Sequence, residues 1–126
     1  MITDISGDVV ERVLAVLVEQ SRFASLHHDI PDFATPSISE LQFGGYTRIP
    51  VQWDTHHGSG FASNTARLLW SGLVFPSRVV AVGLHLEQFG GAVTAYGALT
   101  QPSSITSDSW YLDAGKLVLR LATGLQ

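Results

Sequence analysis

RVVAVGLHL, residues 78–86, is the strongest strand signal in the sequence. Its apolar side chains fall on both faces of an extended chain. That pattern is typical of a strand that is covered on two sides. We therefore predict a strand at the centre of a sheet here, and the remaining segments are interpreted around it.

Short apolar or alternating segments recur about every 10 to 14 residues on either side of this strand, separated by Gly, Pro and Ser. Such spacing predicts a mainly β protein, an antiparallel β-sandwich of Ig-like or jelly-roll-like type. Further strands are expected at residues 22–27, 46–53, 65–69, 92–99, 110–112 and 117–121, with loops or turns at 29–39, 55–64, 88–91 and 102–108.

One helix is expected, over residues 8–19. Apolar side chains recur there at helical spacing, at Val9, Val10, Val13, Leu14 and Leu17. Asp8 and Glu11 have the spacing of a capping box with Asp8 as N-cap. Val16 and Val18 widen the apolar stripe, which predicts a helix buried on more than one side. We expect a single domain over 1–126, with the helix at about 8–19 and the sandwich at about 22–121.

The composition favours assembly with other subunits. Hydrophobic residues make up 45% of the chain and charged residues 14%, against roughly 25% charged in an average soluble protein. So few charges predict that part of the surface is covered by other copies, as in a homo-oligomer.

Nucleic acid and membrane are not expected as partners. The net charge is −4 and the seven basic residues are scattered, so no phosphate-binding patch is predicted. No apolar run approaches the roughly 18 residues of a membrane span, and Asp4 and Asp8 stand where a signal peptide carries positive charge. Without cysteine the chain has neither disulfides nor thiolate metal ligands.

A histidine metal site is the first catalytic or cofactor alternative. The candidates are His27, His28, His56, His57 and His85. Adjacent strand residues point to opposite faces, so neither His-His pair chelates from a regular strand. A three-histidine site requires His56 and His57 to converge with His85 or His27. Surface or subunit-contact histidines are the preferred interpretation, and no cofactor is predicted.

No enzyme class is indicated. The GSG at 58–60 is not the nucleophile elbow of a serine hydrolase, and no two acids share one run as in glycoside hydrolysis. The aromatic residues are an alternative source of function, as a carbohydrate-binding platform, although such residues more often fill a core or an interface. They are Tyr46, Trp53, Trp70, Tyr96, Trp110 and Tyr111.

The stretch FGGYTRIPVQWD, residues 43–54, alternates like a strand, with Arg48 and Pro50 on one face. Proline cannot donate to a central sheet ladder. The segment is therefore either an edge strand that presents its polar face to a partner or the floor of an active site.

The order of the motifs resembles a family of small bacteriophage virion proteins, described as tail fibre or minor tail proteins, some of them capsid-decorating. The matching positions cover about residues 8 to 121: Leu26, His27 and Pro31; Gly45, Tyr46, Arg48, Pro50, Val51 and Trp53; Ser63 and Asn64; Phe75 and Pro76; Gly90 and Gly91; Tyr96, Gly97 and Leu99; and Gly115, Leu117 and Leu119.

The resemblance implies a non-enzymatic β-sandwich subunit located in the virion, made in the bacterial host cytoplasm and bound to other tail or capsid proteins. On this hypothesis Pro50 marks an edge or bulged strand. Arg48 is either an internal anchor, bonded to carbonyls or to an acid such as Asp29 or Asp54, or a contact to a neighbouring subunit, and we favour the anchor. The other anchor or interface candidates are His27, Tyr46, Trp53, Trp70, Tyr96 and Trp110.

Overall fold

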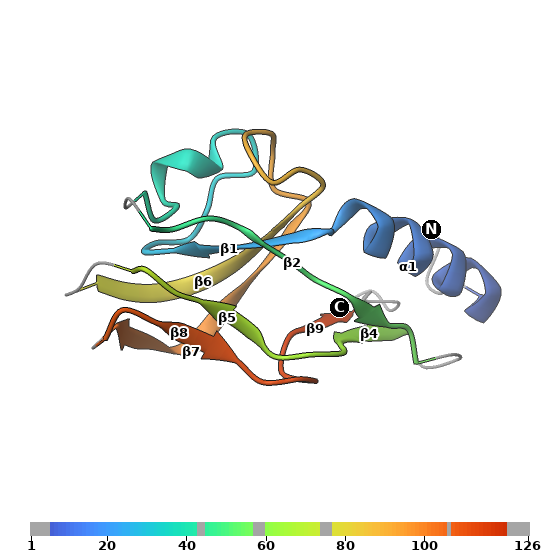
Figure 1. The fold of residues 1–126 in the computed structure, drawn as a ribbon. Helices are drawn as coiled ribbons and strands as arrows, with labels where there is room; N and C mark the ends of the chain where they lie inside the picture. The colour runs from blue at the N-terminus through green and yellow to red at the C-terminus, as the bar shows by residue number, and fades with distance from the viewer. Residues whose placement is uncertain (1–5, 43–44, 57–59, 74–76, 106, 121–126) are drawn as a thin grey trace.

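The computed structural model describes residues 6–42, 45–56, 60–73, 77–105 and 107–120. Figure 1 shows the arrangement of its elements, which follow one another in the order α1 (Gly7–Gln20), β1 (Phe23–His27), η1 (Pro36–Ile38), β2 (Ile49–Pro50), β3 (Trp53–Asp54), β4 (Phe61–Asn64), β5 (Leu68–Trp70), β6 (Ser77–His85), β7 (Ala95–Ile105), β8 (Trp110–Leu112) and β9 (Val118–Arg120). Phe75 and Pro76, two positions of the resemblance, lie outside the described residues.

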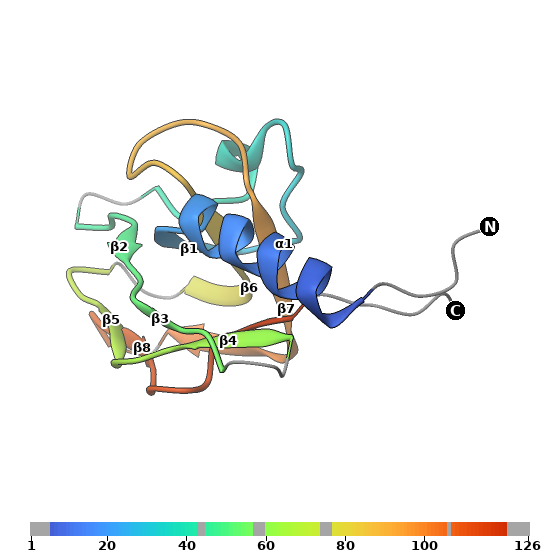
Figure 2. The ribbon, with the colours of Figure 1, turned by 90° about the vertical axis from the view of Figure 1, so that its right-hand side faces the viewer.

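The predicted mainly β, antiparallel sandwich with one N-terminal helix is confirmed. All the strand pairs are antiparallel, in sheets of order β2-β1-β6-β7, β3-β4-β9 and β5-β8. In Figures 1 and 2, β1 and β6 lie above β4, β5 and β8. The apolar core fills the space between the layers, and its largest fully buried side chain is that of Trp70.

The predicted central strand is confirmed, because β6 lies between β1 and β7. The edge assignment of Pro50 is also confirmed, since β2 pairs with β1 on one side only and forms an edge of its sheet. An edge position leaves the missing N–H of proline without a structural cost.

Helix α1 begins one residue earlier than predicted, and its N-cap is Ser6, not Asp8. The Ser6 hydroxyl accepts a hydrogen bond from the Val9 N–H. The prediction of burial on more than one side is wrong in this chain. Val10 and Leu14 are buried, but Val16 is 56% exposed because the sandwich covers only one face of the helix.

Two predicted connections contain strands. The expected turn at 55–64 contains β4, whose small buried residues Ala62 and Ser63 fit between β3 and β9. The expected connection at 102–108 contains the end of β7, which runs through Pro102 to Ile105. The edge position of β7 tolerates this proline.

A bulge divides β7. Val79 pairs with Ser103 and Ala81 pairs with Ala98, so residues 99–102 lie opposite Val80 alone. Extra residues in one strand bend it and increase its twist. The predicted 46–53 strand is likewise interrupted, into β2 and β3.

Candidate functional site

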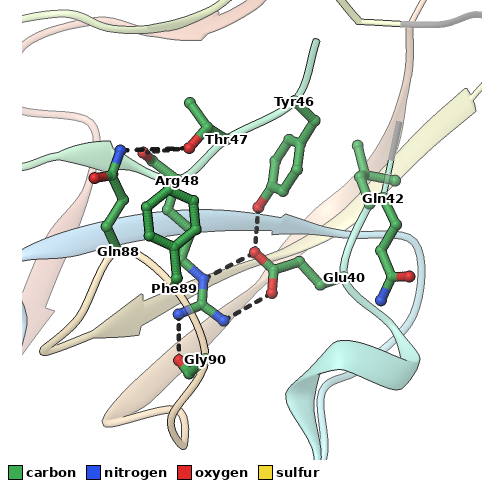
Figure 3. Close-up of a pocket in the computed structure, with 9 residues that line it drawn as sticks. Glu40, Gln42, Tyr46, Thr47, Arg48, Gln88, Phe89 and Gly90 are labelled. Carbon is green, nitrogen blue, oxygen red and sulfur yellow. Dashed lines mark hydrogen bonds and ion pairs between the residues drawn. The ribbon is translucent and has the colours of Figure 1, made fainter. Parts of the chain in front are cut away.

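The most extensively bonded buried polar pair consists of Glu40 and Arg48 (Figure 3). Arg48 Nε donates to Glu40 Oε2 at 2.9 Å and Nη2 donates to Oε1 at 2.8 Å, so the contact is bidentate. The exposed fractions are 5% for Arg48 and 9% for Glu40. A planar guanidinium matches a carboxylate in this geometry. Glu40 comes from the end of the proline-containing loop, and Arg48 from the residues just before β2.

Arg48 also reaches the loop that follows β6. Its Nη1 donates to the backbone carbonyls of Glu87, at 3.1 Å, and Gly90, at 2.6 Å. One side chain therefore ties together the loop carrying Glu40, the entry to β2 and the loop after β6. The predicted internal-anchor role of Arg48 is confirmed.

The prediction that Arg48 pairs with Asp29 or Asp54 is wrong. The Asp29 carboxylate accepts from the N–H of the next residue, Ile30, at 2.8 Å. Asp54 is 62% exposed, and its Oδ2 atom lies 3.9 Å from His56 Nδ1. Glu40 is the partner because the proline-containing loop folds back and pairs it with His27 in an isolated β-bridge.

Tyr46 extends the same network. Its hydroxyl donates to Glu40 Oε2 at 2.6 Å and accepts from the Leu26 N–H at 3.0 Å. Burial, together with the charge of Glu40, raises the pKa of Tyr46 far above its ordinary value. Burial alone would raise the pKa of Glu40, but the bonds from Arg48 and Tyr46 and the Arg48 charge outweigh it and lower that pKa.

A hollow of about 190 Å³ lies over the pair, and it is lined by Glu40, Leu41, Gln42, Tyr46, Thr47, Arg48, Gln88, Phe89 and Gly90. Figure 3 shows Phe89 and the guanidinium of Arg48 among the groups that line it. Glu40 accepts three hydrogen bonds and its pKa is lowered, so it is a weak base. The geometry of this floor suits the positioning of loops better than proton transfer.

A second buried network joins two histidines through serines. Ser25 Oγ lies 2.7 Å from His27 Nε2 and 2.6 Å from His85 Nε2, and Ser39 Oγ lies 2.9 Å from His27 Nδ1. Ser25, His27 and His85 are fully buried. The imidazole rings are nearly parallel, with centroids 6.3 Å apart.

The hydrogen-bond partners indicate which atom donates and which accepts in each bond of this histidine–serine network. Ser39 Oγ donates to the Pro36 carbonyl at 3.4 Å, so it accepts from His27 Nδ1–H. His27 Nε2 then accepts from the Ser25 hydroxyl, which in turn accepts from His85 Nε2–H. His85 Nδ1 has no hydrogen-bond partner within the described residues.

Gly83 makes room for the two rings. It lies opposite Ser25 on the neighbouring strand. A Cβ at position 83 would lie 2.6 Å from Ser25 Oγ and 2.7 Å from His27 Nε2. Only glycine leaves space for this cluster without displacing it.

Both histidines are held neutral. Burial lowers the pKa of His27 to about 4, and the charges of His85 and Arg48 act in the same direction, against Glu40. Burial and the Arg48 charge lower the pKa of His85 to about 4, against Glu40 and the Ala92 carbonyl. Because both rings are sealed from solvent, they are structural groups and not accessible bases.

The tryptophan candidates lie in or beside the core. Trp70 is 1% exposed, and its ring centroid is 5.7 Å from that of the half-buried Trp110. Trp110 Nε1 donates to Ser103 Oγ at 2.9 Å, and Trp53 Nε1 donates to the Ser21 carbonyl at 2.8 Å. These three rings therefore stabilise the sandwich, and the half-buried Trp110 also lines a hollow.

Tyr96 differs from the tryptophans. It is 38% exposed, and its ring centroid lies 5.5 Å from that of Phe33, on the loop after β1. It remains an interface candidate.

The converging three-histidine site finds no support in the described residues. His56 bonds to Ser63 Oγ at 2.8 Å and stacks on Phe61, whereas His27 and His85 meet at Ser25. His57 lies outside the described residues. Within those residues, no cluster of three or more His, Cys, Asp or Glu is arranged to hold a metal ion.

Sequence reasoning missed Glu40 as the partner of Arg48 and missed Ser25 and Ser39 as histidine partners. The spacing of Ser25 and His27, two residues apart in a predicted strand, places them on one face and was the available signal. No feature of the sequence around Glu40 identified it as the partner of Arg48.

In the part of the chain that the structure describes, no helix is long and apolar enough to cross a membrane. No protein-family model matches the chain, and comparison with curated proteins finds no significant match. The resemblance to phage virion proteins therefore stays a prediction.

Proposed function

We propose that this chain is a non-enzymatic structural subunit of a bacteriophage particle, which joins other virion proteins through exposed apolar side chains. Attachment to the tail, as a minor tail or fibre-associated protein, is the form we favour, and capsid decoration is the alternative within the same class. The motif order supports the phage assignment, and the distribution of apolar side chains supports the assembly role.

The observation that carries the proposal is the exposure of large apolar side chains on two neighbouring loops. Phe33, Ile38 and Phe89 are 53%, 75% and 73% exposed. The loops lie side by side, because the Val93 N–H donates to the Phe33 carbonyl at 3.2 Å. Large apolar side chains exposed on adjoining loops are the kind of feature found at sites of protein association.

The buried networks support a structural role as well. The side chains of Arg48 and Tyr46 form hydrogen bonds to Glu40 and to backbone groups. The histidine–serine chain is sealed from solvent. Both arrangements rigidify loops at one end of the sandwich, which a docking surface requires.

The test is immunogold labelling of intact particles with antibody raised against this chain, together with mass spectrometry of the purified particles. We expect label at a fixed position on the tail or over the capsid. Antibody that has been absorbed with the purified chain is the control. Particles that lack the chain by both methods contradict the proposal.

Carbohydrate binding is a second candidate, favoured by a different feature. A hollow of about 450 Å³ is lined by Ser103, Ser104, Ser107, Ser109, Trp110 and Tyr111. Hydroxyl groups beside aromatic residues suit a sugar. A glycan array tests this candidate: binding that Ser104→Ala weakens supports it, and an array without binding removes it.

A further inference from the structure

The first of two surfaces, here called the loop crown, consists of residues 28–42 and 86–94. Besides its exposed apolar side chains, it carries three exposed acids, Asp29, Asp32 and Glu87. Its fourth acid, Glu40, is neutralised by Arg48. The two segments contain no Lys or Arg. The loop crown is therefore apolar and acidic.

The second surface, here called the sheet face, is the outer side of β5, β8 and β9 with their adjoining turns. Leu69 and Tyr111 are directly paired across β5 and β8, and each is 51% exposed. Val118 on β9 is 46% exposed. The Arg67 guanidinium lies over the Tyr111 ring, 4.4 Å from its centroid. The sheet face thus has an apolar centre of its own.

The charge of the sheet face is opposite to that of the loop crown. Residues 66–70 and 107–120, with residue 106 outside the described part, contain Arg67, Lys116 and Arg120 as cations and Asp108 and Asp113 as acids. Asp113 pairs with Arg67 at 2.8 Å, and of the remaining charges the two cations, Lys116 and Arg120, outnumber the one acid, Asp108, which sets a positive sign.

The two surfaces lie at opposite ends of the molecule. In Figures 1 and 2 the loop crown, in cyan and orange-brown, is at the top, and β5 and β8 are at the bottom. One copy therefore presents its loop crown away from its own sheet face, where a second copy can reach it.

We propose that copies of this chain associate head to tail, the loop crown of one docking on the sheet face of the next. Apolar centres meet in this arrangement, and the acidic rim meets the basic one. Crown-to-crown pairing would instead bring like charges together, which costs free energy. A head-to-tail contact is heterologous, so it builds rings or open arrays, as a particle component needs.

This inference deepens the proposed function, on which it rests, by naming a second copy of the chain as the partner. The experiment is sedimentation of the full chain over a range of concentrations at low and high salt. We expect mass to rise with concentration, and association to weaken at high salt because opposite charges are screened.

Complementing variants test the direction of the contact. Phe89→Ser alters only the loop crown and Leu69→Ser only the sheet face, and each is expected to weaken self-association about tenfold or more. Mixed together, the two variants retain one intact crown and one intact face between them, so they form heterodimers and stop there. Val16→Ser on the exposed face of α1 is the matched control and leaves association unchanged. Phe33→Ser and Tyr111→Ser provide a second pair should either first variant misfold.

Three results overturn the inference: a wild-type chain that stays monomeric at every concentration, a mixture of folded variants without heterodimers, or association lost by Val16→Ser alone. Particle labelling keeps this test separate from the proposed function. A virion protein that does not self-associate refutes only the head-to-tail contact. A self-associating chain that is absent from particles refutes only the virion assignment.

Discussion

Gly83→Ala is the sharpest test of the buried histidine–serine network. The added methyl would lie 2.6 Å from Ser25 Oγ and 2.7 Å from His27 Nε2, and both atoms belong to fully buried residues. Gly83 has no positive φ, so the substitution adds volume without backbone strain. Any loss of stability therefore reports on the packing of this cluster.

The magnitude follows from two effects. Overpacking costs on the order of 1–3 kcal/mol, and the two bonds of Ser25 to the rings are worth about 1 kcal/mol each. The expected loss is about 3–5 kcal/mol in the free energy of unfolding. For a domain of this size that lowers Tm by roughly 10–20 °C.

Urea denaturation followed by tryptophan fluorescence measures the loss. Gly97→Ala is the matched control, because Gly97 lies on the neighbouring strand β7 and a Cβ there meets no atom within 4 Å. Ser25→Ala in combination with Gly83→Ala is expected to cost less than the two single changes together, since both remove the same bonds. A Gly83→Ala protein as stable as Gly97→Ala, within about 0.5 kcal/mol, refutes the described packing.

Three further predictions concern the anchor, the histidines and the helix cap. Arg48→Met leaves the buried carboxylate of Glu40 without its charged partner, and we expect the free energy of unfolding measured in urea to fall by about 3–5 kcal/mol. Arg48→Lys recovers only part of this, and full recovery by lysine would contradict the bidentate role. His27 and His85 have pKa values lowered from 6.5 to about 4, so the folded chain takes up protons less readily than the unfolded chain. Above pH 6.5 the two rings leave the free energy of unfolding unchanged. As the pH falls from 6.5 toward about 4, the free energy of unfolding decreases by roughly 3 kcal/mol for each ring. Denaturation midpoints that stay constant across this range would contradict it. Ser6→Ala removes the cap of α1 and is expected to cost about 0.5–1 kcal/mol by thermal melting, and no measurable loss would show that the cap does not contribute.

The sequence alone determined the features that each segment encodes by itself. The continuous apolar run of β6 identified a strand covered on both faces, and Pro50 identified an edge, because proline lacks the donor that a central ladder requires. The periodicity of α1 identified a helix. It did not reveal that the sandwich covers only one of the two apolar faces of the helix, because that depends on how the sheets are placed against α1.

The tertiary structure alone decided which polar groups meet. Arg48 required a buried acid, but Glu40 became its partner only through the return of the proline-containing loop to His27. Likewise the register of β1 against β6 placed Gly83 beside Ser25 and brought His85 within reach of it. Hydrogen bonds and ion pairs act over a few ångströms, so partners such as Ser25 and His85, 60 positions apart along the chain, are fixed by packing and register, and no local pattern encodes them.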